Sequence, residues 1–110
     1  MNVSFEGIGR LAVTFPQSGC KAGQMCKVGV NGVVVPCAQG EEFCGIVEGV
    51  RGGVAAVQLE GFVKVPLSGT IGTGYAQLCA DGKGGVKVGT GRQYLVVGAD
   101  FSAGYAIIKL

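Results

Sequence analysis

The chain of 110 residues contains no histidine and no tryptophan, and its 22 glycines leave few uninterrupted segments. The longest glycine-free segment runs from Arg10 to Ser18, and Pro16 lies inside it. A typical α-helix of about 11 residues would therefore contain a glycine, which costs about 1 kcal/mol relative to alanine. The placement of glycine thus predicts an all-β chain.

The lack of histidine also restricts what the cysteines can do. A cysteine nucleophile has no histidine to act as its base. Structural zinc sites space their ligands as Cys-x2-4-Cys, and the gaps here are all wider. The number of cysteines is odd and no secretion signal precedes them, so we expect no disulfide framework. We predict neither a metal nor a cofactor, and we expect thiols that pack as small apolar side chains at Cys20, Cys26, Cys37, Cys44 and Cys79.

Charge is sparse, with nine basic and seven acidic residues and a net charge of +2. The basic residues stand singly, which gives no electrostatic footprint for nucleic acid. Residues 1–7 have neither the basic region nor the apolar core of a signal peptide. No window has the roughly 18 apolar residues that a membrane-spanning helix needs. We expect no nucleic-acid or membrane partner, and a protein that is not secreted.

Two nucleotide-binding motifs are present only in part. Residues 7–12 match the dinucleotide fingerprint G-x-G-x-x-A, but too few residues precede them for a strand, and Pro16 follows where a helix would run. Lys83 lies between glycines, but Gln77 stands where a P-loop requires glycine and Gly84 where it requires serine or threonine. Neither motif predicts a nucleotide site.

The serines and glutamates that stand out in the sequence receive structural interpretations. Ser18 and Ser68 lie in Pro-x-Ser-Gly turns and lack the glycine two residues earlier that a nucleophile elbow requires. Glu41, Glu42 and Glu48 are expected to form a solvated edge, which discourages pairing between strands of different molecules.

The three tyrosines are expected to be core or interface residues. No basic residues interleave with Tyr75, Tyr94 and Tyr105, so they do not form a stacking platform for bases. With no catalytic or binding residue assigned, the sequence predicts that the protein is not an enzyme.

What the sequence does contain is an internal repeat. Residues 13–19 (VTFPQSG) return as residues 63–69 (VKVPLSG), and each copy alternates apolar and polar residues before a proline and a Ser-Gly turn. Gln24-Met25-Cys26 returns as Gln77-Leu78-Cys79, and the apolar positions of 55–59 return in 106–110. We therefore divide the chain into two related halves, residues 13–60 and 63–110.

Turn residues separate short predicted strands. Asn31-Gly32 favours a type I′ turn between strands 25–30 and 33–37. Residues 51–53 join strands 43–50 and 54–65, with Gly61 as a bulge or bend. Further strands are predicted at 75–80, 86–88, 92–99 and 104–110.

This spacing indicates a small barrel or sandwich, similar to a β-clip, built from two pseudo-repeated halves of about 50 residues. Residues 1–11 are predicted to be an N-terminal arm and residues 12–110 a single β-domain. The apolar content of 48% and a mean hydropathy of +0.47 suggest surface that a partner covers, so we expect a homo-oligomer.

The order of these segments resembles the small capsid decoration, or head-stabilising, proteins of tailed phages and prophages. Residues 12–110 carry the resemblance, in patterns of glycine and valine rather than in reactive residues. The segments concerned are 21–24 (KAGQ), 33–35 (VVV), 41–49 (EEFCGIVEG), 57–66 (VQLEGFVKVP) and the ending 98–110.

The resemblance implies a compact β-rich protein, often trimeric, on the outer surface of a capsid where major capsid protein subunits meet. It would reside in the virion, or in the host cytoplasm before assembly. The family has no catalytic residues to carry over. Its N-terminal arm, which extends the sheet of the capsid protein, corresponds to Met1–Arg10, and the five cysteines are not part of its pattern.

A small carrier or ligand-binding barrel, similar to biotinyl and lipoyl domains, is the alternative. Those domains present a lysine at the tip of a central hairpin. Here the corresponding tip, residues 51–53, carries Arg51, and Lys83 lies in the other half. A carrier purified from its native host would show the added mass of its cofactor.

Overall fold

The structure is a computed structural model and describes residues 9–110. Most of the predicted N-terminal arm, residues 1–8, lies outside the described residues. Residues 9–110 form nine strands and one short 3-10 turn (Val30–Gly32). The strands are β1 (Leu11–Pro16), β2 (Met25–Val28), β3 (Val34–Pro36), β4 (Gly45–Arg51), β5 (Val54–Glu60), β6 (Phe62–Pro66), β7 (Gly74–Ala80), β8 (Val86–Asp100) and β9 (Tyr105–Lys109).

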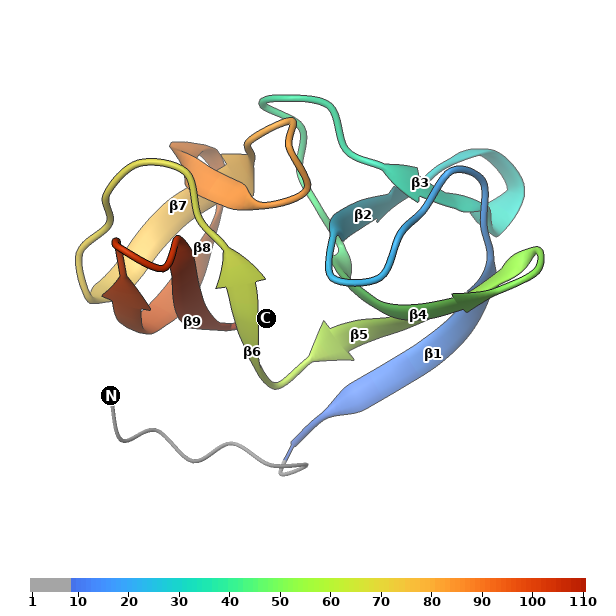
Figure 1. The fold of residues 1–110 in the computed structure, drawn as a ribbon, viewed down its shortest axis with the longest axis horizontal. Helices are drawn as coiled ribbons and strands as arrows, with labels where there is room; N and C mark the ends of the chain where they lie inside the picture. The colour runs from blue at the N-terminus through green and yellow to red at the C-terminus, as the bar shows by residue number, and fades with distance from the viewer. Residues whose placement is uncertain (1–8) are drawn as a thin grey trace.

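The strands form two antiparallel sheets that lie side by side (Figure 1). The first sheet has the order β1-β5-β4-β2-β3 and the second the order β6-β9-β8-β7. The chain passes from one to the other at Gly61, whose φ of +97° suits glycine. We call residues 11–60 the first half and residues 62–110 the second half. The prediction of an all-β fold is confirmed.

The two sheets share one pairing scheme. β1 pairs with β5 as β6 pairs with β9, and β5 pairs with β4 as β9 pairs with the C-terminal part of β8. β7 then pairs with both parts of β8, as β2 pairs with both β4 and β3. The ladders contain matching irregularities, at Val47/Gly49 in β4 and at Val96/Gly98 in β8.

Each sheet curls until its two edges touch. A single parallel bridge joins Gln17, just after β1, to Val34 of β3, and a second joins Leu67 to Val86 in the same way. Ser18 N–H donates to Val34 O at 3.0 Å, and Ser68 N–H to Val86 O at 2.9 Å. One bridge is not a continuous ladder, so neither sheet is a closed barrel. The structure is therefore a pair of curled sheets.

The ladders correct one step of the repeat alignment. In the first sheet Cys26 lies opposite Pro36 and Val28 opposite Val34, whereas in the second Leu78 lies opposite Val88. Because Val34 and Val86 occupy the same place, Leu78 is the counterpart of Cys26 on the side of β3. On the side of β4 the counterpart is Ala76, because Cys26 lies opposite Gly45 and Ala76 lies opposite Tyr94. The sequence match of Cys26 to Cys79 is therefore wrong on both sides, since an irregularity between Gln77 and Leu78 shifts the register between β7 and β8.

Local turns follow the prediction more closely than strand lengths do. Asn31 and Gly32 have φ values of 58° and 74°, and Val33 N–H donates to Val30 O, as a type I′ turn requires. The predicted strand 54–65 is instead two strands in different sheets. The predicted strands 86–88 and 92–99 are one continuous strand, β8.

Two apolar cores result. The first-half core lies inside the first sheet and consists of Cys20, Cys26, Val34, Val47, Ala55 and Val57. The shared core fills the second sheet and the junction between the halves. It joins Met25, Phe43 and Ile46 of the first half to Val63, Val65, Leu78, Val86, Tyr94, Val96, Ala106, Ile108 and Leu110.

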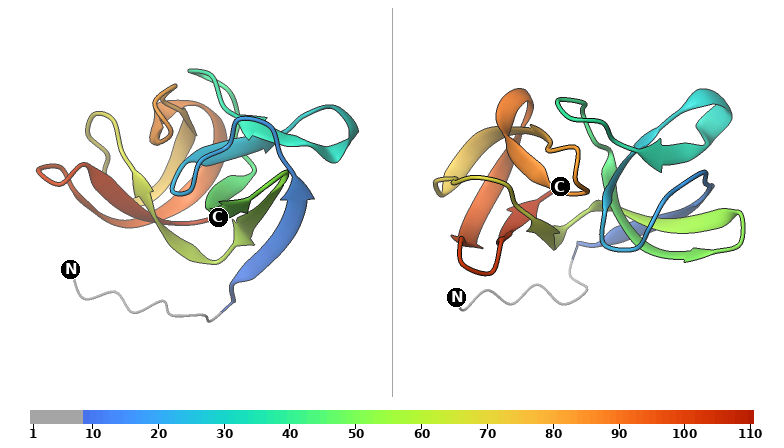
Figure 2. Two further views of the ribbon diagram at one scale, coloured as in Figure 1. Left: turned by 45° about the vertical axis from the view of Figure 1, so that its right-hand side comes forward. Right: turned by 45° about the horizontal axis from the view of Figure 1, so that its top comes forward.

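Backbone hydrogen bonds fasten the same junction. Gly40 N–H donates to Ala80 O and Ala80 N–H to Glu41 O, both at 2.9 Å. Met25 N–H donates to Gly84 O at 2.9 Å. Figure 2 shows the loop before β4 reaching the β7–β8 turn of the second sheet from two further sides. The halves are thus joined by core packing and by main-chain contacts.

Candidate interaction surfaces

The glutamates are divided between ion pairs rather than gathered in a cleft. Lys27 Nζ and the Ala38 N–H donate to the Glu41 carboxylate, and Lys27 is the main cause that lowers the pKa of Glu41. Glu48 pairs with Arg10, next to β1. Of the three glutamates Glu42 is exposed, whereas Glu41 and Glu48 are half-buried in their ion pairs.

Asp81, which the sequence did not single out, accepts more hydrogen bonds than Glu41, Glu42 or Glu48. Its carboxylate accepts from Ser68 Oγ at 2.5 Å, from Lys83 N–H at 2.7 Å and from Gly85 N–H at 2.9 Å. Burial opposes the charged form, yet these hydrogen bonds outweigh it and lower the pKa of Asp81. Asp81 therefore fastens its own turn to the end of β6. An Asp before a glycine-rich turn was the available signal.

All five cysteines are free thiols, and four of them lie in the first half. Cys20, Cys26 and Cys79 are buried, as expected, while Cys37 and Cys44 are half-buried. A hydrogen bond with Cys44, reinforced by burial, raises the pKa of Cys26, and the same hydrogen bond lowers the pKa of Cys44. Burial raises the pKa of Cys37 to about 11. The raised pKa values keep Cys26 and Cys37 protonated, and protonated thiols are poor nucleophiles. Residues 9–110 contain no group of three or more potential ligands placed to hold a metal ion.

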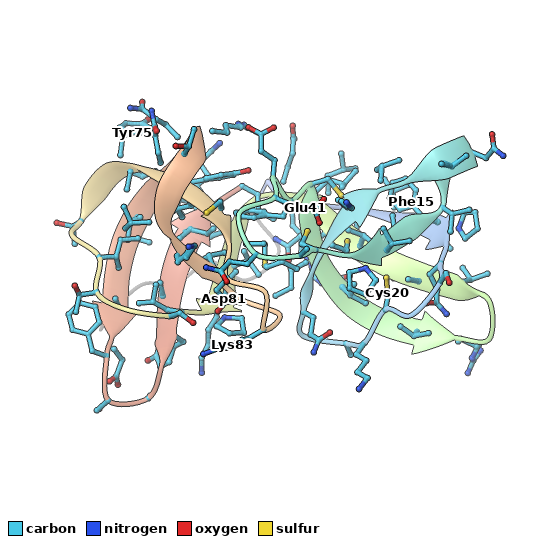
Figure 3. The ribbon with its side chains drawn as sticks, turned by 90° about the horizontal axis from the view of Figure 1, so that it is seen from above. Phe15, Cys20, Glu41, Tyr75, Asp81 and Lys83 are labelled. Atoms are coloured by element: carbon cyan, nitrogen blue, oxygen red, sulfur yellow. The ribbon has the colours of Figure 1, made fainter. Side chains whose placement is uncertain are left out.

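The three tyrosines occupy three different environments. Tyr94 is buried and stacks on Phe43, with 4.9 Å between ring centroids. Tyr105 is half-buried, with Lys64 Nζ 4.0 Å from its ring centroid. Tyr75, on β7, is 73% exposed and points away from the body of the second sheet (Figure 3). An exposed aromatic residue of this size identifies Tyr75 as a candidate contact residue.

The two positions considered for a carrier lysine lie on exposed turns. Residues 51–53 form the tip of the β4–β5 hairpin and carry Arg51. Lys83 is exposed on the β7–β8 turn, and its backbone N–H is engaged by Asp81. The structure thus places no lysine at the tip of the β4–β5 hairpin.

A groove of about 430 Å³ crosses the junction of the halves. Its lining contains one amine and one phenol, and the amine lies over the phenol ring. It contains no carboxylate and no thiol, so it has no pair of carboxylates placed for acid–base chemistry. The lining residues are Gly23, Ile46, Lys64, Val65, Pro66, Ala103, Gly104 and Tyr105.

A second groove, of about 300 Å³, lies near the tip of the β4–β5 hairpin. Its walls are mainly apolar because Val50 and Val54, 39% and 43% exposed, line it together with Ala56 and Gly49. Thr14 and Arg51 complete it.

Large exposed apolar side chains are the most prominent surface feature. They occur on β1, β2, β4, β5, β7 and β8 and on two turns. They are Leu11, Val13, Val28, Val30, Val50, Val54, Tyr75, Val88 and Phe101. Exposed apolar side chains that stand singly are common on soluble proteins, whereas those that gather, as Val50 and Val54 do in the second groove, indicate a binding surface.

Comparison of the sequence with protein-family models and with curated proteins gave no match. No helix within residues 9–110 has the length and apolar character of a membrane-spanning segment.

Proposed function

We propose that this chain is a structural protein of a tailed phage or prophage, which decorates and stabilises the outer surface of the capsid without catalysis. The observation that carries the proposal is the apolar groove beside the β4–β5 hairpin, where Val50 and Val54 are exposed together. Such side chains favour burial against a partner at about 25 cal/mol per Å² of apolar surface. Among the described residues, Arg10 pairs with Glu48 and Lys27 with Glu41, and Asp81 holds a turn. These ionisable side chains lie apart and do not converge in a cleft.

The capsid contact, in this proposal, includes the groove beside the β4–β5 hairpin. This groove is apolar and open, so a side chain of the major capsid protein can enter it and bury Val50 and Val54. Many copies of such a contact, each of modest area, oppose the outward pressure on a shell. The protein then belongs to the virion, and to the host cytoplasm before assembly.

Binding to purified phage heads tests the proposal. The heads should come from the phage or prophage that carries this gene, and binding is measured by cosedimentation and by the temperature at which the heads release their DNA. We expect saturable binding and a higher release temperature. Absence of binding at micromolar concentration, together with a cofactor mass on the protein from its native host, would favour the carrier alternative and contradict the proposal.

A pair of matched variants locates the contact. Replacing Val54 by glutamate puts a charge into the groove, and we expect it to weaken head binding by about 30-fold or more, the loss of a hot-spot residue. Val88→Glu changes a similarly exposed valine on the second sheet and should leave head binding within about threefold. Equal effects of the two variants would place the contact elsewhere.

A further inference from the structure

The contact between the two halves uses two distinct surfaces. On the first half, Met25 and Ile46 lie directly opposite each other on β2 and β4 and contribute to the shared core. We call this pair the covering face. On the second half, Val63 and Val65 of β6 are buried in the same core, with exposed fractions of 9% and 0%. We call this side of β6 the covered strand.

The covering face has a counterpart on the second half that the described residues leave partly exposed. Val96 pairs with Ile108 as Val47 pairs with Val57, so the preceding residue Leu95 corresponds to Ile46. Tyr75 lies opposite Leu95, as Met25 lies opposite Ile46. Met25 is 1% exposed, whereas Tyr75 is 73% exposed and Leu95 half-buried.

The covered strand has an uncovered counterpart on the first half. β1 pairs with β5 as β6 pairs with β9, and Val13 and Phe15 stand where Val63 and Val65 stand. Val13 is 36% exposed and Phe15 half-buried, and Leu11 at the start of β1 is 45% exposed. β1 is also an edge strand, with an apolar sequence that invites association.

One molecule cannot bring its own two uncovered surfaces together. In Figure 3, Tyr75 lies at the outer end of the second-half lobe, and Phe15 lies in the other lobe. The junction of the halves stands between them. Two molecules, by contrast, can bring these surfaces together. The two surfaces are the counterparts of the covering face and the covered strand, which fit each other within one chain.

We propose that copies of this chain associate head to tail, with Tyr75 and Leu95 of one copy packed against Leu11 and Val13 of the next. The contact between molecules repeats the contact between the halves of one molecule. Because two different surfaces meet, the interface is heterologous, and it gives a ring when the rotation between copies closes. Each chain contributes two equivalent units to such a ring.

One sequence difference suits a surface that is solvated before assembly. Tyr75 replaces Met25, and tyrosine is enriched in interfaces because its ring is apolar and its hydroxyl is polar.

This inference goes beyond the proposed function, because it names a self-association that needs no capsid. A chain that binds phage heads as a monomer would support the capsid proposal and contradict the head-to-tail contact. A ring that does not bind phage heads would support the head-to-tail contact and contradict the capsid proposal.

Mass measurements on purified protein test the contact. Light scattering after size-exclusion chromatography should give a multiple of the 11.1 kDa chain mass. We expect Tyr75→Glu and Val13→Glu each to reduce the mass to that of one chain, with self-association weakened by about 30-fold or more. Val30→Glu, at a residue that is 83% exposed but outside both surfaces, should leave the mass unchanged.

Mixing the two variants tests whether the two surfaces bind each other. Tyr75→Glu leaves the β1 surface intact, and Val13→Glu leaves the Tyr75 surface intact, so an equimolar mixture keeps one functional contact per pair. We expect the mixture to form heterodimers and nothing larger. The native mass separates the two symmetries, because an isologous contact ends at two chains and a head-to-tail ring contains three or more.

Three outcomes overturn the proposal: a native chain that stays monomeric at about 1 mM, an oligomer that Tyr75→Glu leaves intact, or a mixture that forms no heterodimer although each variant is folded. Circular dichroism and the midpoint of thermal unfolding establish folding. If Val13→Glu does not fold, Leu11→Glu, at a more exposed position of the same strand, takes its place.

Discussion

The two halves of this chain share one pairing scheme but fill it differently. On the side of β3 the first half has Cys26 where the second has Leu78, and at the start of the ladder between β4 and β5 it has Gly45 where the second half has Tyr94. Their coverage differs as well, because Val63 is buried while Val13 is 36% exposed. The two sheets therefore repeat the same strand pairing with different core side chains, and each core is filled in its own way.

The difference at one ladder position has a specific cause. A Cβ on Gly45 would collide with the backbone carbonyl of Gln58, so β4 and β5 approach too closely there for any side chain. At the equivalent place in β8, Tyr94 instead fills space and stacks on Phe43 of the other half. The junction between the halves therefore depends on a position where the repeat has diverged.

Gly45→Ala should produce the largest effect, since the neighbouring atoms are backbone and cannot rotate away. We expect a loss of about 3 kcal/mol or more in the free energy of unfolding, measured by urea denaturation. Gly53→Ala is the matched control, because a Cβ there meets nothing within 4 Å, and it should change stability by no more than about 0.5 kcal/mol. A tolerated Gly45→Ala would show that β4 and β5 can separate.

Asp81→Asn tests the hydrogen bonds by which Asp81 holds the β7–β8 turn to the end of β6 in the second half. The folded pKa of Asp81 is lowered, so its charged form adds stability above the ordinary aspartate pKa of about 4, and that stability is lost as pH falls through the lower folded pKa. We expect Asp81→Asn to cost about 2 kcal/mol at pH 7 and much less near pH 2. Urea midpoints at both pH values measure this.

Asp100→Asn is the control for this pH dependence. Asp100 is the last residue of β8, before an exposed turn whose Ser102 Oγ and Ala103 N–H donate to it. We expect a smaller effect than for Asp81→Asn. If the wild type and Asp81→Asn lose stability in parallel between pH 7 and pH 2, the fastening role of Asp81 is wrong.

Val63→Ala and Val13→Ala compare equivalent positions directly. Truncation of buried Val63 should cost about 2 kcal/mol, and truncation of Val13 less than about 0.5 kcal/mol in the monomer. The comparison belongs at low micromolar concentration, where self-association contributes least. Similar losses at the two positions would mean that β1 is covered even in the single chain.

Much of the fold could be predicted from particular residues. Glycine spacing excluded long helices, Asn31-Gly32 marked a type I′ turn, and the repeated Pro-x-Ser-Gly phrase marked the ends of β1 and β6. What the pattern left undecided was where a strand changes sheets. Gly61 is compatible with a bulge as well as with a crossing, because glycine adopts either conformation at little cost.

The interaction surfaces were much less predictable. Alternation in the sequence shows that Val13 and Val63 face inward, but it does not show what lies against them. Tyr75 was expected in a core or an interface, and only its exposed fraction of 73% distinguishes the two. Asp81 was overlooked because Ser68, one of its partners, is 13 residues away in the sequence.

The sequence by itself determined the all-β character, the doubled organisation and the positions of the tight turns, because glycine, proline and asparagine act through local backbone geometry. The tertiary structure alone decided that the chain forms two curled sheets, that Met25 and Ile46 enter the core of the other half, and that β1 stays uncovered. Those outcomes depend on contacts between residues far apart in the chain, and a periodic pattern specifies a face without specifying its partner.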